Sequence, residues 1–207
     1  MATAQRSPTV FVVDDDDGVR EAIGLLLDSV KLPFTGFSSA TDFLTSFDPD
    51  RPGCLVLDLR MPGMSGIELQ SRLRAMGSHI PIVFVTAHGD VPTAVEAVKA
   101  GAVDFIQKPF QDQKLLDMIN EALDRDARDR AAMDEVEAIE ARLASLTPRE
   151  REVMSLVAVG KRNKAMAREL GISQRTVEVH RARVMEKMNA HSVSELVQMV
   201  LKTGDER

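Results

Sequence analysis

The stretch Val10-Phe11-Val12-Val13-Asp14-Asp15 is a short apolar run, mostly β-branched, that ends in two carboxylates. Similar apolar runs follow at 54–57, 80–85 and 103–106, with a weaker one at 34–37. Amphipathic segments that alternate with these runs lie at 17–30, 38–47, 65–76 and 91–100. Continuous apolar runs are typical of strands buried on both faces, and their alternation with helices indicates a parallel sheet. The first part of the chain is therefore predicted to be a doubly wound α/β domain with five strands.

The remainder of the chain has a helical pattern. No Gly or Pro occurs between Phe110 and Thr147, which predicts a last helix of the first domain continuing into a helical linker. The apolar spacing in the linker covers too few heptads to predict a coiled coil. Thr147-Pro148-Arg149-Glu150 then combines an N-cap, a first-position Pro and a capping Glu, so a second domain is expected to begin there. The predicted divisions are 1–123, 124–145 and an all-helical 146–207.

The composition excludes several classes of protein. Of 207 residues, 44% are hydrophobic and 28% charged, which is typical of a globular chain. The single cysteine, Cys54, excludes a disulfide scaffold and a cysteine-based zinc cluster. No signal-peptide pattern is present, and no apolar run approaches the roughly 18 residues of a membrane span. A cytoplasmic protein without a membrane partner is expected.

The net charge of −6 conceals an asymmetry between segments. Residues 1–120 contain 10 Lys and Arg against 16 Asp and Glu, whereas residues 146–207 contain 12 against 8. Within the latter, residues 160–190 contain 8 basic and 3 acidic side chains. Such asymmetry indicates different partners for the two domains, and the basic segment is compatible with nucleic acid.

Polar side chains follow four of the predicted strands, at the edge where functional groups gather in open parallel sheets. Asp14 and Asp15 follow the first strand, Asp58 the third, Thr86 the fourth and Lys108 the fifth. Converging carboxylates repel one another unless a cation lies among them, and Mg²⁺ is the natural candidate, with Mn²⁺ or Ca²⁺ as substitutes. A carboxylate beside that ion can form an aspartyl phosphate, while a hydroxyl and an ammonium hold the phosphoryl oxygens. Each feature alone is common as an ordinary surface group, but their coincidence favours a site.

Four segments closely resemble the receiver domain of bacterial response regulators. They are Val12-Val13-Asp14-Asp15, the run from Leu57-Asp58-Leu59-Arg60 to Gly66, Val85-Thr86-Ala87-His88-Gly89 and Lys108-Pro109-Phe110. The resemblance implies a flavodoxin-like sheet and a sensor histidine kinase that phosphorylates Asp58. It also implies Mg²⁺ ligation by Asp14, Asp15, Asp58 and the Arg60 carbonyl, with phosphoryl contacts from Thr86 and Lys108. A cis Lys108–Pro109 peptide and a switch aromatic at Phe105 are further expectations from the resemblance.

Residues 163–188 show the spacing of a helix-turn-helix. Ala167 allows close helix approach, Gly171 supplies a positive φ, and Val177 reaches the core. At 100° per residue, the second helix places Val177, Val184 and Met188 on one inner face. The opposite face, which would face a possible groove, then carries Arg175, Glu178, Val179, Ala182 and Glu186. The candidate DNA contacts are Lys161, Arg162, Lys164, Ser173, Gln174, Arg175, Thr176, Glu178, Val179, Arg181, Ala182, Arg183 and Lys187. A basic helical dimerisation domain is the alternative for this segment.

The run from Leu146-Thr147-Pro148 through Ser194-Glu195-Leu196 resembles the LuxR-type DNA-binding domain of the NarL and FixJ regulators, and the domain order matches the FixJ-like subfamily. Where some relatives carry Lys, this chain has Glu178, so base preferences cannot be copied. The predicted function is a non-enzymatic, phosphorylation-dependent regulator that binds promoter DNA as a homodimer, with RNA polymerase as a candidate partner. The alternatives are a Mg²⁺-dependent phosphatase, which leaves the DNA module unexplained, and a small-ligand sensor, which the scarcity of aromatic residues disfavours.

Overall fold

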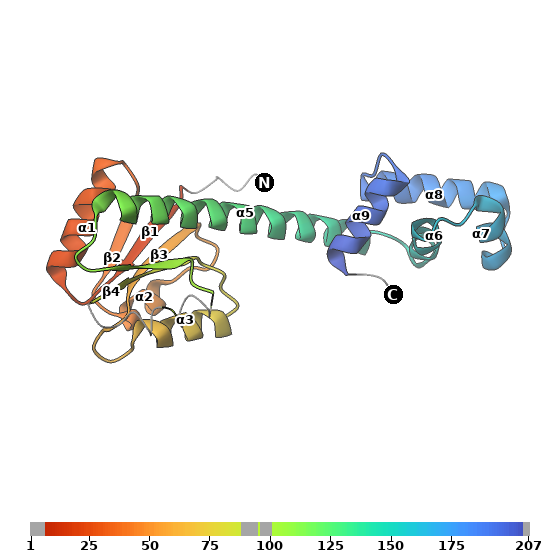
Figure 1. Ribbon diagram of the computed structural model, residues 1–207. Coiled ribbons are helices and arrows are strands. Elements are labelled where there is room, and N and C mark those ends of the chain that lie inside the picture. Colours follow the sequence, from red (N-terminus) through yellow and green to blue (C-terminus); the bar gives the residue numbers. More distant parts are fainter. Residues whose placement is uncertain (1–6, 88–94, 96–100, 205–207) are drawn as a thin grey trace. The chain divides into compact units, whose positions relative to one another are not determined.

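A computed structural model of the chain describes residues 7–87, 95 and 101–204. The chain divides into two compact units, Met1–Arg130 and Ala131–Arg207, and Figure 1 shows their elements. The boundary between them falls inside the segment 124–145 that was expected to be a linker. The domain boundaries expected from the sequence (1–123, 124–145 and 146–207) remain predictions. Among the described residues, no helix combines the length and the apolar character that crossing a bilayer requires.

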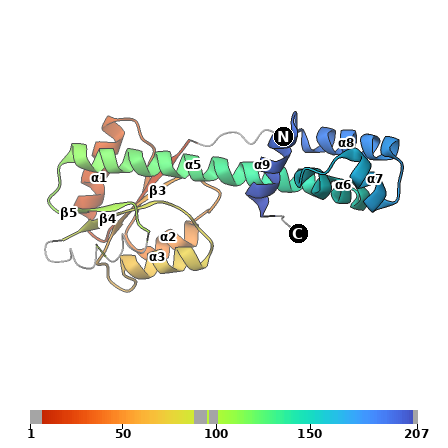
Figure 2. The same cartoon turned by 45° about the vertical axis from the view of Figure 1, so that its right-hand side comes forward.

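The first unit is built on a five-stranded parallel sheet with the order β2-β1-β3-β4-β5, as predicted. Its strands are β1 (Thr9–Val13), β2 (Phe34–Phe37), β3 (Gly53–Asp58), β4 (Ile82–Thr86) and β5 (Asp104–Gln107). Every residue of β1, β3 and β4 is buried, which is why these runs are continuously apolar. The fifth strand lies at one edge, beside β4 (Figure 2).

Helices cover both faces of this sheet (Figure 1). They are α1 (Asp17–Ser29), α2 (Ala40–Ser46), α3 (Gly66–Ala75) and the first part of α5 (Asp112–Ala144). Alternate strand residues point to opposite faces, so Leu55 and Leu57 pack with α2 and α3, whereas Val56 packs with α1 and α5. The sheet therefore has two separate apolar cores, and the buried polar residues of its inner strands, Thr9, Asp58 and Thr86, lie at strand ends.

One local expectation differs from the structure. The fourth strand begins at Ile82 instead of Ile80, because Pro81 has no N–H to donate to the ladder; its carbonyl accepts from Leu55 N at 2.9 Å. The helix expected at 91–100 lies outside the described residues except for Val95, which is helical. At the start of α3, Ser65 and Glu68 form a capping box.

The predicted long helix is confirmed as α5, which is continuous across the boundary between the units. After it come α6 (Pro148–Ala158), α7 (Asn163–Leu170), α8 (Gln174–Met188) and α9 (Val193–Thr203). Ile139, Leu143 and Leu146 are buried in the core of the second unit, together with residues from α6 to α9. The apolar stripe expected in the linker therefore belongs to the core of the helical unit.

Candidate functional site

The carboxyl ends of β1 and β3 bring three carboxylates together. One oxygen each from Asp14, Asp15 and Asp58 lies within 4.8 Å of the other two. Asp14 and Asp58 are buried at the ends of adjacent strands, whereas Asp15 is exposed. The backbone N–H of Arg60 donates to Asp58 Oδ1 at 3.2 Å. Three oxygen donors, two of them buried, match the ligand preference of a small hard cation such as Mg²⁺.

Lys108 connects two of these carboxylates. Its Nζ donates to Asp14 Oδ2 at 2.7 Å and to Asp58 Oδ2 at 3.0 Å. The backbone N–H of Lys108 donates to the Thr86 carbonyl at 2.8 Å, and the following peptide to Pro109 is cis, as the resemblance implied. The backbone of Lys108, which directly follows β5, is thus attached to the last residue of β4, and its ammonium reaches the carboxylates at the ends of β1 and β3.

The pKa values of Asp14 and Lys108 are both shifted by their surroundings in this cluster. Burial is the largest influence on Asp14 and raises the pKa of its carboxyl, and the nearby Asp58 charge acts in the same direction. Burial acts to lower the pKa of Lys108, but its hydrogen bonds to Asp14 and Asp58 outweigh this, so that the pKa is raised. Lys108 is therefore cationic at neutral pH, and the carboxylates gain from positive charge nearby.

Thr86 and Phe105 flank the cluster. Thr86 is fully buried and follows Val85, which pairs with Asp58 in the register of β3 and β4. Its hydroxyl donates to the Ala87 carbonyl at 3.2 Å. Phe105 is half-buried and packs against the core on the α2 and α3 side of the sheet. His88, part of the quoted receiver pattern, lies outside the described residues.

Asp14 is held in place by two residues that were not predicted from the sequence to take part in the site. Asp16 is the N-cap of α1 and accepts from Gly18 N at 2.8 Å, while its own N–H donates to Asp14 Oδ1 at 3.0 Å. Arg20 Nη1 donates to the Asp14 carbonyl at 2.6 Å. An Asp directly before an amphipathic segment is a recognisable N-cap signal, but nothing in the sequence indicates the role of Arg20.

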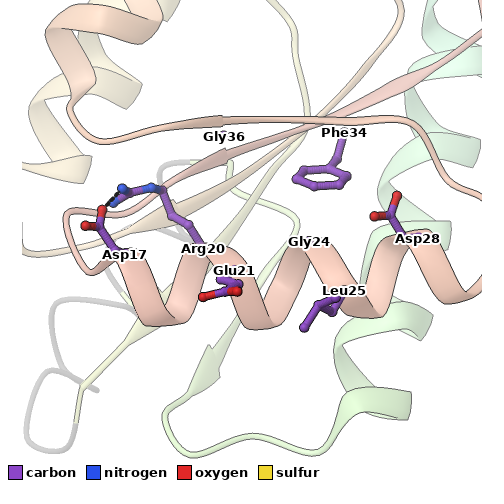
Figure 3. Close-up of a pocket in the computed structure, with 8 residues that line it drawn as sticks. All are labelled: Asp17, Arg20, Glu21, Gly24, Leu25, Asp28, Phe34 and Gly36. Atoms are coloured by element: carbon purple, nitrogen blue, oxygen red, sulfur yellow. Dashed lines mark hydrogen bonds and ion pairs between the residues drawn. The ribbon is translucent and has the colours of Figure 1, made fainter.

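A surface hollow of about 390 Å³ is lined by residues of α1 and β2 (Figure 3). Its lining residues are Asp17, Arg20, Glu21, Gly24, Leu25, Asp28, Phe34 and Gly36. The guanidinium of Arg20 is engaged with Asp17 and with the Asp14 carbonyl, so the lining offers acidic groups without an unengaged cation. This hollow is unsuited to binding a nucleotide or another polyanion.

The second unit contains the predicted helix-turn-helix, formed by α7 and α8. Gly171 ends α7 with φ 66°, in the left-handed region that the sequence analysis expected. Ser173 caps α8 by accepting from Thr176 N at 3.0 Å. Val177, Val184 and Met188 are fully buried, which confirms the predicted inner face of α8.

The opposite face of α8 is exposed. Its exposed residues from the predicted set are Gln174, Arg175, Glu178, Val179, Ala182 and Arg183. Val179 is 46% exposed, so that an apolar side chain lies on this face among the charged ones. A surface of this kind, with charged groups around a small apolar side chain, is compatible with base edges and a thymine methyl group.

Several of the predicted phosphate-contacting cations have partners within the protein. Lys161 forms an ion pair with Glu169, and Arg181 Nη1 donates to Asn163 Oδ1 at 3.2 Å. Lys187 Nζ donates to Glu150 Oε2 at 2.7 Å. The hydrogen bond from Lys187 is the largest cause of a pKa of about 2 for the Glu150 carboxyl, and the Thr147 N–H contributes in the same direction.

Comparison with known proteins identifies both units. Residues 10–120 match the response regulator receiver domain, and residues 144–200 match the bacterial regulatory proteins of the luxR family. The chain is 49% identical over 196 residues to the transcriptional regulatory protein FixJ of Bradyrhizobium diazoefficiens, covering 94% of this chain and 95% of that protein. It is 46% identical to Nodulation protein W of the same organism, over 95% of this chain and 86% of that one.

Solved structures give the same result. The response regulator StyR matches with a TM-score of 0.87 and 50% identity, over 95% of this chain and 99% of that chain. Full-length FixJ from B. japonicum matches with a TM-score of 0.60 and 46% identity, over 97% and 99%. The sequence resemblances to a receiver domain and to a LuxR-type domain are confirmed by these matches.

Proposed function

Because the chain belongs to the response regulators that join a receiver domain to a luxR-family DNA-binding domain, we propose that phosphorylation of Asp58 controls its binding to promoter DNA. The receiver domain implies a sensor kinase as partner, and the second domain implies DNA binding. The observation that carries the proposal is the contact of one ammonium, that of Lys108, with both Asp14 and Asp58. It marks the place where a cation and a transferred anion would be accommodated together.

In the proposed reaction, an oxygen of the Asp58 carboxylate attacks the phosphorus of a phosphohistidine on the kinase. The new P–O bond forms as the P–N bond breaks, and the departing imidazole retains the electron pair and takes up a proton from the solvent. The Lys108 ammonium turns from the carboxylates to a phosphoryl oxygen, and the Thr86 hydroxyl exchanges the Ala87 carbonyl for another. Thr86 ends β4, the strand beside the Asp58 strand β3, and Lys108 follows β5, which lies beside β4.

The donor set fits a divalent cation. Asp14, Asp15 and Asp58, together with the Arg60 carbonyl, are the proposed ligands, with Mg²⁺ as the preferred ion and Mn²⁺ or Ca²⁺ as substitutes. Burial and the nearby Asp58 charge raise the pKa of Asp14, and a cation bound between the two carboxylates would act in the opposite direction. When bound, the ion neutralises negative charge on the transferred phosphoryl group.

Phosphorylation is proposed to act on the second domain through Thr86 and Phe105, which lie on adjacent strands β4 and β5. A shift of these two residues alters the surface of the receiver domain and promotes homodimerisation, release of the DNA-binding domain, or both. The dimer then binds a DNA site with approximate two-fold symmetry, and RNA polymerase is a further candidate partner. The protein takes part only in its own phosphorylation and dephosphorylation, and turnover of other phosphoesters is not expected.

One experiment tests this function. The full chain is incubated with acetyl phosphate and Mg²⁺, and mass and DNA binding are followed in parallel with an Asp58→Asn control. A phosphoryl adduct that is absent from the control, together with stronger DNA binding, is expected. An adduct that persists in Asp58→Asn, or DNA binding that ignores the adduct, contradicts the proposal. Continuous phosphate release from small phosphoesters would instead indicate a phosphatase.

A further inference from the structure

The basic side chains predicted to contact DNA phosphates fall into two groups. Four of them, Arg162, Lys164, Arg175 and Arg183, are exposed, and no described residue forms a hydrogen bond or ion pair with their side-chain cations. The other three, Lys161, Arg181 and Lys187, have partners inside the second unit. Counting basic residues in the sequence therefore overstates the number of cations that are available to phosphates.

Lys187 is the most firmly held of the three. Its ammonium donates to Glu150 Oε2 at 2.7 Å and to the Ser145 carbonyl at 3.1 Å. The Glu150 side chain is only 3% exposed, and its carboxylate also accepts from the Thr147 N–H at 2.9 Å. If Lys187 left for a phosphate, it would leave a buried carboxylate without its counter-ion, which is strongly unfavourable. The Lys161–Glu169 pair differs, because both partners are partly exposed and such pairs contribute little.

The ion pair of Lys187 and Glu150 joins two helices of the second unit. Glu150 lies in the first turn of α6, and Lys187 lies in the last turn of α8. Val153 of α6 and Val184 of α8 are fully buried in the same core beside the pair. The pair thus fastens the far end of α8 to the start of α6, while Ser173 caps the other end of α8 beside the turn. The orientation of the exposed face of α8 depends on both attachments.

We propose that Lys187 is a positioning residue that holds α8 through Glu150, and that phosphate contacts are made by Arg162, Lys164, Arg175 and Arg183. The proposal rests on the DNA-binding function proposed above. Arg162 and Lys164 lie at the start of α7 and Arg175 at the start of α8, where helix N-termini add to the attraction for phosphate. Lys187 contributes to affinity through the orientation of α8, without neutralising a phosphate.

The dependence of DNA binding on salt distinguishes these two roles. Each phosphate that a protein cation neutralises contributes about 0.9 to the slope of log K against log salt. The full chain, treated with acetyl phosphate and Mg²⁺, is titrated with a labelled duplex of mixed sequence at several KCl concentrations. Lys187→Gln is compared with its matched control Lys164→Gln, and stoichiometric titration gives the active fraction of each variant.

Lys164→Gln is expected to lower the slope by about 0.9. Lys187→Gln is expected to weaken binding at every salt concentration with the slope unchanged and the active fraction complete, and Lys187→Arg is expected to restore affinity. A slope that falls by about 0.9 in Lys187→Gln overturns the proposal. A wild-type chain that shows no salt-dependent binding instead contradicts the proposed function itself.

Glu150→Gln keeps the inference testable if Lys187→Gln fails to fold. This variant retains every basic side chain, so a phosphate-contacting Lys187 would leave DNA affinity equal to or above that of the wild type. A positioning role predicts weaker binding with an unchanged slope. It also predicts that the double variant, Glu150→Gln with Lys187→Gln, binds DNA no more weakly than the single variant with the lower affinity, because both substitutions break the same ion pair.

Discussion

The Asp126 carboxylate accepts a hydrogen bond from the backbone N–H of Gly53 at 2.8 Å, which joins α5 to the first residue of β3. Arg130 Nε donates to both Asp126 oxygens at 3.0 Å, and its Nη2 donates to the carbonyls of Pro49 and Arg51 at 3.0 and 2.9 Å. The two turns of α5 that follow residue 123 are therefore attached to the receiver unit. They lie at the end of the sheet opposite the carboxylate cluster.

Asp126→Ala is expected to destabilise the receiver unit by about 1–3 kcal/mol, because it leaves the Gly53 N–H and the Arg130 guanidinium without their acceptor. Urea unfolding of the full chain measures the change. Asp129→Ala is the matched control: Asp129 lies one turn later and pairs with Arg125 at 3.7 Å with both side chains about half exposed. A change within about 0.5 kcal/mol is expected for the control. Equal losses of unfolding free energy in the two variants would show that the buried contacts of Asp126 contribute no more to stability than the exposed pair of Asp129.

Gly66→Ala is expected to slow phosphorylation and to destabilise the fold by at least about 1 kcal/mol. A Cβ at Gly66 would lie 2.3 Å from the Asp58 carbonyl oxygen, so the start of α3 or the end of β3 would have to move. Gly36→Ala is the control, since its nearest neighbour would be Arg20 Cδ at 3.9 Å. The adduct formed with acetyl phosphate is followed by mass spectrometry, and equal rates in the two variants would contradict this prediction.

Lys108→Gln is expected to lower the rate of Asp58 phosphorylation by about 10²-fold, the usual cost of removing one donor to a developing anion. The ammonium that contacts Asp58 at 3.0 Å is then absent when the phosphoryl group arrives. Lys114→Gln, an exposed lysine in the first turn of α5, is the control and is expected to react at the wild-type rate. Rates for Lys108→Gln within twofold of that control would exclude the proposed role.

The stability of the second unit is expected to depend on the ionisation of Glu150 at acidic pH. Its pKa is lowered from the ordinary 4.5 to about 2, so its ionised form stabilises the folded state above pH 4.5. This stabilisation declines below pH 4.5 and is lost as the pH falls through about 2. Denaturation followed by circular dichroism should show that wild type exceeds Glu150→Gln in stability near neutral pH and that the gap closes towards pH 2. A constant gap would refute the assignment.

Much of the candidate site was predictable because of where it lies in a parallel sheet. Asp58, Thr86 and Lys108 follow buried apolar runs, and the carboxyl ends of such strands must meet at one edge. The inner face of α8 was likewise predictable, since Val177, Val184 and Met188 recur at helical spacing. These features depend on local periodicity, which a linear sequence displays directly.

The sequence sufficed for the fold class, the succession of the described strands and helices along the chain, the long helix α5 and the residues at the strand ends. It could not show that Asp126 reaches Gly53, 73 positions away, or that Lys187 reaches Glu150 instead of solvent. In the sequence, Lys187 and Lys164 are equivalent, since both are lysines of the basic segment 160–190. Only folding distinguishes them, because burial of Glu150 makes its ion pair costly to break, whereas the exposed Lys164 forms no hydrogen bond or ion pair with any described residue.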